Sequence, residues 1–155
     1  MPIDSSTLLF FDASCLIAAA GSPTGGSSFL LAVCARGFLR AAVSHLVLGE
    51  AEGNILTNLP APAWQRYQQQ ILTLPLLVAP IPTREECQAT TPIAGGKDAH
   101  VLASARSVAA PFLIALDQRL IQRVNEASLP LRALTPGDFI TSELPHHPAY
   151  PVMRS

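Results

Sequence analysis

The sequence contains little of the positive charge that proteins use to bind polyanions. Lysine occurs once, at Lys97, and the nine arginines are scattered along 155 residues. Charged residues make up 14% of the chain, whereas they make up about a quarter of a typical soluble domain. Because no basic stripe is present, the composition does not predict tight non-specific binding to nucleic acid.

Cysteine is also rare. The three cysteines, Cys15, Cys34 and Cys87, are widely spaced and form no CxxC motif. The four histidines do not fall at zinc-ligand spacings either. These patterns argue against a disulfide framework and against a structural zinc site, so we expect buried, reduced thiols.

Long hydrophobic segments are missing, although 49% of the residues are hydrophobic. No apolar run reaches the roughly 18 residues that a membrane-spanning helix needs. Asp4 and Asp12 bracket the first apolar run and no basic segment precedes it, which argues against a signal peptide. The apolar content and the net charge of -1 argue against disorder. We therefore expect a soluble cytoplasmic protein that does not bind membranes.

Short apolar segments alternate with segments of helical periodicity. The predicted strands are 7–11, 41–43, 76–79, 112–116 and 131–134, and the predicted helices are 14–20, 27–38, 44–59, 64–74, 84–88, 99–108 and 118–125. This alternation predicts a three-layer α/β/α domain with a central parallel sheet. We expect this domain to span residues 1–142. Residues 143–155 should form an irregular, proline-rich tail in which His146 and His147 are solvated.

Four acidic residues occupy positions that suggest chemistry. Asp12 and Asp117 follow predicted strands, Glu50 lies in the helix after the second strand, and Asp98 lies in the first turn of a helix after two glycines. Each has a structural alternative: Asp98 could cap its helix, Asp12 and Asp117 could form turns, and Glu50 could be solvated. In open parallel sheets, however, sites gather beyond the carboxyl ends of the strands. The four positions together therefore predict a shared site.

Carboxylates that converge on one point raise each other's pKa, and a divalent cation relieves their repulsion. Oxygen ligands without histidine or thiolate select Mg²⁺ or Mn²⁺ rather than zinc. A cation held in this way polarises a phosphoryl oxygen and lowers the pKa of water. The pattern therefore predicts metal-assisted phosphodiester hydrolysis.

The order of these motifs resembles the PIN-domain family, a metal-dependent ribonuclease fold that includes the VapC-type toxins of toxin–antitoxin pairs. The similarity covers roughly residues 8–140. It rests on the segments LLFFDASCL (8–16), SHLVLGEAEGNI (44–55), KDAHVLASA (97–105), LIALD (113–117) and LTPGDF (134–139).

The resemblance implies that Asp12, Glu50, Asp98 and Asp117 bind one or two Mg²⁺ or Mn²⁺ ions for RNA cleavage. Asp12 and Asp98 would be the primary ligands, and Ser14 would orient the site. Glu52 is the rival of Glu50, but a shift of two residues points it to a different face of the helix.

The sequence departs from the family pattern in two respects. Many relatives have another acidic or polar metal neighbour after the fourth aspartate, whereas Gln118 and Arg119 follow it here, and Arg119 could contact the substrate phosphate instead. The basic charge is also low, so RNA binding would depend on the metal, on a few arginines or on a partner.

Other functions remain open on sequence grounds. The same fold could serve as an interaction module with a vestigial site. A phosphoacceptor or nucleotide-binding domain is disfavoured, because the first strand lacks an acidic pair and no phosphate-binding glycine motif follows it. The apolar stretch from Phe29 to Phe38 predicts a homodimer interface or an antitoxin-binding groove.

Overall fold

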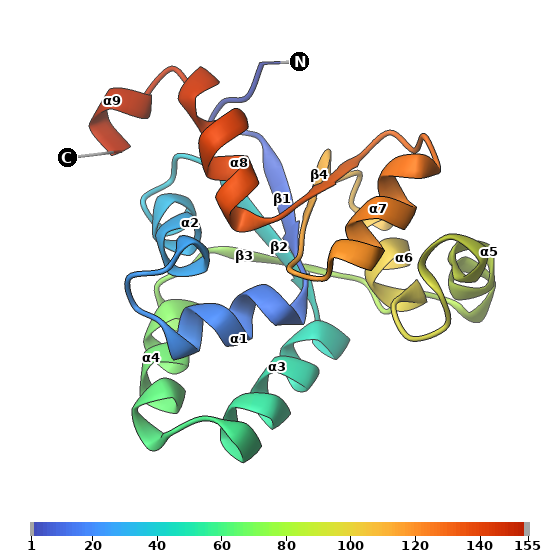
Figure 1. Ribbon diagram of the computed structural model, residues 1–155, viewed down its shortest axis with the longest axis horizontal. Coiled ribbons are helices and arrows are strands. Elements are labelled where there is room, and N and C mark those ends of the chain that lie inside the picture. Colours follow the sequence, from blue (N-terminus) through green and yellow to red (C-terminus); the bar gives the residue numbers. More distant parts are fainter. Residues whose placement is uncertain (1, 154–155) are drawn as a thin grey trace.

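The computed structural model describes residues 2–153 and contains a five-stranded, all-parallel sheet (Figure 1). The strand order is β3-β2-β1-β4-β5. The strands are β1 (Leu8–Phe11), β2 (Arg40–Ser44), β3 (Leu76–Ala79), β4 (Phe112–Ile114) and β5 (Arg132–Leu134). This order places β1 in the centre, so the carboxyl end of β1 lies between the carboxyl ends of β2 and β4.

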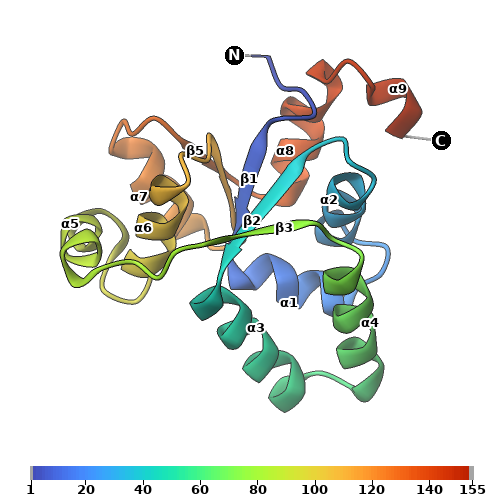
Figure 2. The ribbon, with the colours of Figure 1, turned by 180° about the vertical axis from the view of Figure 1, so that it is seen from behind.

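Helices flank the sheet in two groups, which lie on opposite sides in Figures 1 and 2. The elements are α1 (Ala13–Gly21), α2 (Gly26–Ala35), α3 (His45–Asn58), α4 (Ala61–Leu72), α5 (Arg84–Ala94), α6 (Ala99–Ser107), α7 (Gln118–Glu126), α8 (Pro136–Ser142), η1 (Leu144–His146) and α9 (Tyr150–Met153). Helix α1 contacts α2, α3 and α4, whereas α5 contacts α6 and α7. The predicted fold class, a central parallel sheet between helices, is confirmed.

The core explains why the strands read as continuous apolar runs. All four residues of β1 are buried, and Leu9, Phe10 and Phe11 have no exposed surface. Strands of a parallel sheet are covered on both faces, so they do not alternate between apolar and polar residues. Phe139 of α8 adds an edge-to-face contact with Phe112 of β4, with the ring centroids 5.1 Å apart.

Several helix starts follow from capping side chains. The hydroxyl of Ser44 accepts a hydrogen bond from the amide of Val47, and Thr83 forms a capping box with Glu86 at the start of α5. Helix α5 then continues to Ala94, beyond the predicted end at 88. At α1 the N-cap residue is Asp12, so the helix begins at Ala13, one residue before the predicted start at 14.

The segment after residue 142 is not irregular, which corrects the predicted tail. It contains η1 and α9, with Leu144 and Met153 buried. His147 is buried rather than solvated: its Nδ1 accepts from the amide of Ala149, so Nε2 carries the proton and donates to the carbonyl of Phe38 at 2.6 Å. The domain boundary at 142 remains a prediction, and Met1, Arg154 and Ser155 lie outside the described residues.

This C-terminal segment changes the interpretation of the apolar stretch from Phe29 to Phe38. Arg36 donates hydrogen bonds to the carbonyls of Val152 and Met153, and His147 packs edge-on against Phe38. Only Phe29, at 36%, is counted among the exposed large apolar side chains of this stretch. The stretch is therefore covered mainly by the chain itself, and its role in a homodimer interface or an antitoxin-binding groove remains a prediction.

The cysteines agree with the prediction in two of three cases. Cys15 and Cys34 are buried, and Cys87 is half-buried. Burial raises the pKa of the Cys15 thiol above its usual range and that of Cys34 to about 12. Within residues 2–153, no single helix is both long and apolar enough to cross a membrane; α1 and α2 together match a span in length and composition, but they are bent by 102°.

Candidate active site

The carboxyl ends of β1 and β4 bring Asp12 and Asp117 to one edge of the sheet. The two strands are neighbours, with Phe11 aligned to Ile114. The amide of Asp12, which follows β1, donates to the carbonyl of Ile114 at 2.9 Å. Asp117 lies three residues beyond Ile114 and begins α7. Parallel pairing therefore carries both residues to the carboxyl edge of the sheet, after neighbouring strands.

Ser14 links these two strand ends through its hydroxyl group. It donates to Oδ2 of Asp12 at 2.7 Å and accepts from the amide of Leu116 at 3.1 Å. Asp12 is 8% exposed, so this bond supports a largely buried carboxylate. Oδ1 of Asp12 has no hydrogen-bond donor in the part of the chain that the structure describes. The serine therefore fixes one carboxylate oxygen and leaves the other available.

Asp117 has a structural role as well as a place in the site. Its Oδ1 accepts from the amides of Arg119 and Leu120, at 2.9 and 3.3 Å, and so caps α7. The turn that the sequence suggests as an alternative role is thus present. Its Oδ2 has no donor among residues 2–153, so capping occupies only one oxygen.

Asp98 occupies the N-cap position of α6, but its side chain makes no capping hydrogen bond. The pKa of Asp98 is raised above its ordinary value, first by burial and then by the negative charges of Asp12 and Asp117. The positive charges of Lys97 and His100 lower it by less. Asp12 and Asp117 therefore lie close enough to Asp98 to disfavour its charged form, and the side chain of Asp98 makes no hydrogen bond among the described residues that would explain its position.

The fourth predicted site residue, Glu50, lies on a different helix from Asp98 and Asp117. It lies exposed on α3 and is absent from the charges that shift the pKa of Asp98. Its rival Glu52 turns the other way and accepts a hydrogen bond from the hydroxyl of Tyr67 at 2.7 Å. Glu52 thus has a structural role, whereas the predicted role of Glu50 remains a prediction.

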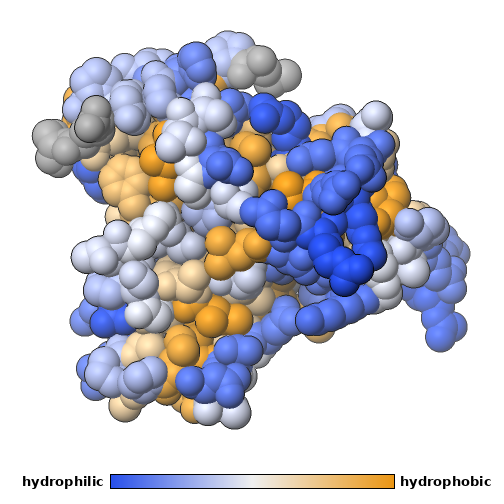
Figure 3. All heavy atoms as spheres, viewed as in Figure 1, coloured by the Kyte–Doolittle hydropathy of each residue, from blue (hydrophilic) through white to orange (hydrophobic). Residues whose placement is uncertain are grey.

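The positive groups around the site are few. Arg119 is exposed on α7, and Figure 3 shows a strongly hydrophilic surface over this helix, where Gln122 and Arg123 are also exposed. Sequence analysis did not assign Lys97 or His100 to the site, although the charges of both lower the pKa of Asp98. Their positions directly before and two residues after Asp98 could have signalled this. Nδ1 of His100 is buried and has no hydrogen-bond partner within the described chain.

The donor set suits a hard cation, because each of the three aspartates has at least one free oxygen and no thiolate takes part. The present arrangement is loose. Among residues 2–153, no three His, Cys, Asp or Glu side chains form a group that could hold a metal ion as they stand. One oxygen of Asp12 is bonded to Ser14, and one oxygen of Asp117 is bonded to backbone amides.

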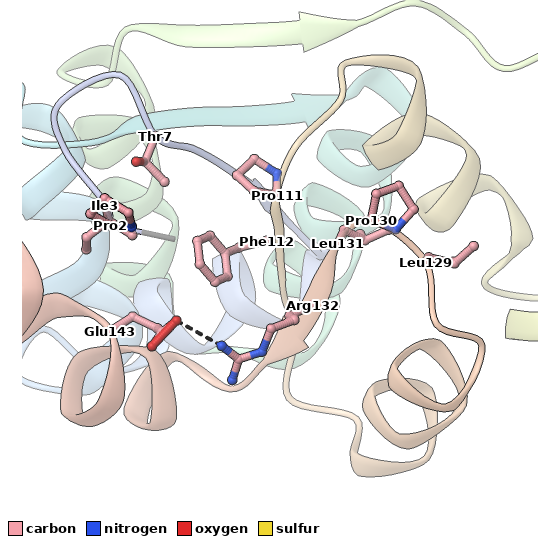
Figure 4. A pocket seen from close by; sticks show the side chains of 10 residues that line it. All are labelled: Pro2, Ile3, Thr7, Pro111, Phe112, Leu129, Pro130, Leu131, Arg132 and Glu143. Carbon is pink, nitrogen blue, oxygen red and sulfur yellow. Dashed lines mark hydrogen bonds and ion pairs between the residues drawn. The ribbon is translucent and has the colours of Figure 1, made fainter.

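The site is separate from an apolar cavity of about 230 Å³ that lies at the amino ends of β4 and β5. Phe112 and Leu131 line this cavity beside the ion pair of Arg132 with Glu143, whose nitrogen and oxygen are 2.9 Å apart (Figure 4). None of the candidate site residues lines it.

Comparisons with known proteins find similarity in structure. No family model matches the chain, and no curated protein sequence matches it significantly. The crystal structure of PAE2754 from Pyrobaculum aerophilum matches with a TM-score of 0.56 and 20% identity, over 83% of this chain and 84% of that one. The structure of VapBC2 from Rickettsia felis, bound to a DNA fragment from its promoter, matches with a TM-score of 0.56 and 12% identity, over 83% of this chain and 98% of that one. At these identities the likeness establishes the fold, and the chain has the PIN-like α/β fold that its sequence motifs predict.

Proposed function

We propose that this protein is a metal-dependent ribonuclease that hydrolyses RNA phosphodiester bonds at the site formed by Asp12, Asp98 and Asp117. The environment of Asp98 is the observation that carries the proposal. This carboxylate has a raised pKa, no hydrogen-bond partner among the described residues and two carboxylates beside it. A carboxylate whose ionised form is energetically disfavoured, and which makes no stabilising hydrogen bond, is typical of a functional site.

The side chains divide the work as follows. Asp12 and Asp98 would be the primary ligands of Mg²⁺ or Mn²⁺, and Asp117 and Glu50 would bind a second ion or act through water. When bound, the cation supplies positive charge that polarises a phosphoryl oxygen and lowers the pKa of water. Ser14 keeps Asp12 oriented through its bond to Oδ2. Removal of any one carboxylate changes the charge of the whole cluster, so each should affect cleavage.

RNA would approach over the exposed start of α7. Arg119 lies two residues after Asp117 and is exposed, so its guanidinium can reach a phosphate next to the cluster. The chain has only ten lysines and arginines in total, so we expect it to make a small number of phosphate contacts. RNA affinity should therefore decrease with increasing salt concentration, but only with a shallow slope.

We also infer a protein partner. VapC-type toxins act in toxin–antitoxin pairs, and the VapBC2 structure is similar in fold. An antitoxin that covers the acidic edge would inhibit cleavage and supply the basic charge that this chain lacks. A homodimer and a cytoplasmic location are further parts of this proposal.

Cleavage of labelled single-stranded RNA by the purified protein tests the proposal. We expect activity with Mg²⁺ or Mn²⁺, none with EDTA, and a loss of at least about a hundredfold in Asp98→Asn. Asp138→Asn is the matched control, because Asp138 is exposed on α8 and outside the site. Equal cleavage by wild-type protein and Asp98→Asn would contradict the proposal and indicate a contaminating nuclease.

A second candidate is a PIN-fold interaction module without substantial catalysis. It is favoured by the loose arrangement of the carboxylates, since no three ligands within residues 2–153 are ready to hold a metal. This candidate predicts a folded protein that binds a partner but neither binds Mg²⁺ or Mn²⁺ nor cleaves RNA. The cleavage assay, together with metal titration, separates the two candidates.

A further inference from the structure

The two edge strands of the sheet, β5 and β3, differ in whether their outward backbone groups have hydrogen-bond partners. At the β5 edge, the side-chain amide of Asn125 donates from Nδ2 to the carbonyl of Ala133 at 2.9 Å and accepts at Oδ1 from the amide of Ala133 at 2.8 Å. Asn125 thus takes the place of the next strand. Because both backbone groups of Ala133 are satisfied, this edge cannot readily pair with another chain.

The β3 edge has no such cover. The backbone of Leu76–Ala79 pairs with β2, and no side chain or loop among residues 2–153 bonds to its outer side. Figure 2 shows β3 along the near side of the molecule with no helix in front of it. In a parallel pair, alternate residues of an edge strand direct their N–H and C=O groups outward. The open groups of β3 therefore match one kind of occupant, an extended strand.

The side chains of this edge are apolar and exposed. Leu77 and Val78 are 37% and 39% exposed, and the flanking Leu72 and Ile81 are 85% and 71% exposed. No charged residue occurs from 67 to 83. Natural edge strands commonly carry a lysine or another charge that prevents pairing with other chains, and this edge carries none. Pro75 and Pro80 flank the strand and limit its length.

We propose that β3 is a dimerisation strand, on which a second copy of this chain pairs antiparallel through its own β3. The two five-stranded sheets would then form one continuous sheet about a twofold axis at Leu77, with Leu76 of one copy opposite Val78 of the other. Such an interface places each surface against itself. A segment without charge meets itself without repulsion, whereas a charged strand from another protein would find no complementary charge here.

Arg40, the cation nearest to this edge in the sheet, fits the arrangement. It immediately precedes Ala41, which pairs with Leu76, and it lines the same hollow as Leu76 and Leu77. About the proposed axis, the two copies of Arg40 are offset by about four residues, or about 13 Å along the strands. This exceeds the roughly 8 Å screening length at physiological salt, so the two arginines do not oppose pairing.

Light scattering over a concentration series tests the proposal with Val78→Lys. We expect a dimer in the wild-type protein and a dissociation constant raised roughly tenfold or more in the variant, because the edge then carries the charge that blocks strand pairing. Phe29→Lys on α2 and Leu56→Lys on α3 are matched controls at exposed apolar positions and should leave the dimer intact. A monomeric wild-type protein, or a dimer that resists Val78→Lys but dissociates in either control, overturns the proposal.

Hydrogen exchange of the wild-type protein keeps the test independent of how the variants fold. We expect the outward amides of Leu76–Ala79 to gain protection as the protein concentration rises through the dimerisation range. Unchanged exchange at β3 across a demonstrated monomer–dimer transition would also overturn the proposal. Neither measurement depends on ribonuclease activity.

Discussion

The replacement of Ser14 by alanine should destabilise the protein through the link between β1 and β4. The serine hydroxyl donates to the buried carboxylate of Asp12 at 2.7 Å and accepts from the amide of Leu116 at 3.1 Å. A hydrogen bond to a charged group contributes about 1.5–3 kcal/mol. Leu116 is 42% exposed, so we expect water to replace the serine at its amide at little cost. Alanine regains at most about 0.5 kcal/mol as a better helix former in α1.

The net loss is therefore about 1–2.5 kcal/mol in the free energy of unfolding. For a chain of this size the melting temperature falls by about 2–4 °C for each kcal/mol, which gives a decrease of about 2–10 °C. Urea denaturation followed by circular dichroism measures the free energy directly. A reduced midpoint with an unchanged slope would identify a loss of native-state stability.

The chain offers a matched control in Ser6. Its hydroxyl donates to Oδ1 of Asp4 at 2.6 Å with the same two-residue spacing, but both residues are exposed. Ser6→Ala should leave the melting temperature unchanged. In an Asp12→Asn background, Ser14→Ala should cost only about 0.5–1.5 kcal/mol, because the bond is then between neutral groups. Equal effects of Ser6→Ala and Ser14→Ala, or the same cost in both backgrounds, would refute the reasoning.

Three further predictions concern the site and the sheet. Asp98→Asn should raise the melting temperature at pH 7 without added metal, because the raised pKa of Asp98 means that its ionised form disfavours folding. The gain in melting temperature should disappear below about pH 4, where the carboxyl is protonated in the unfolded chain too. A variant that is no more stable than the wild-type protein at pH 7 would contradict this prediction. Asn125→Ala should cost about 2–4 kcal/mol in urea denaturation, because it leaves both backbone groups of the fully buried Ala133 unpaired; a loss below about 0.5 kcal/mol would show that another group seals this edge. Phe139→Ala should cost about 3–5 kcal/mol, because Phe139 is fully buried against Phe112, and near-normal stability would indicate that the core collapses around the cavity.

Apolar runs were sufficient to predict the sheet, and its topology places Asp12 and Asp117 after the neighbouring strands β1 and β4. Parallel strands leave their signature in the local sequence, and the direction of the sheet then fixes which ends come together. The apolar pattern of a helix predicts its buried face less precisely: Ile55 is buried, whereas the adjacent Leu56 is 60% exposed. The side chains of consecutive helical residues point in directions about 100° apart around the helix axis, so only one of two adjacent residues can point straight into the core.

The C-terminal segment could not be predicted because its order comes from distant contacts. Its prolines suggested an irregular tail, yet Pro145 and Pro151 lie in the first turns of η1 and α9, where the absence of an amide proton costs nothing, and Pro148 lies in the turn between them. Phe38 and Arg36 provide the partners that hold it. Local sequence also could not tell which aspartate is a cap and which is free, since Asp12 and Asp117 accept backbone hydrogen bonds and Asp98 does not.

The most direct test of the account is calorimetric titration of Mg²⁺ and Mn²⁺ into the purified protein at neutral pH. If Asp12, Asp98 and Asp117 form one cation site, the wild-type protein and Asp138→Asn should bind with the same affinity, and Asp98→Asn should bind at least about tenfold more weakly. An absence of binding to the wild-type protein, or an affinity that Asp98→Asn leaves unchanged, would contradict the assignment of these three carboxylates to a metal centre.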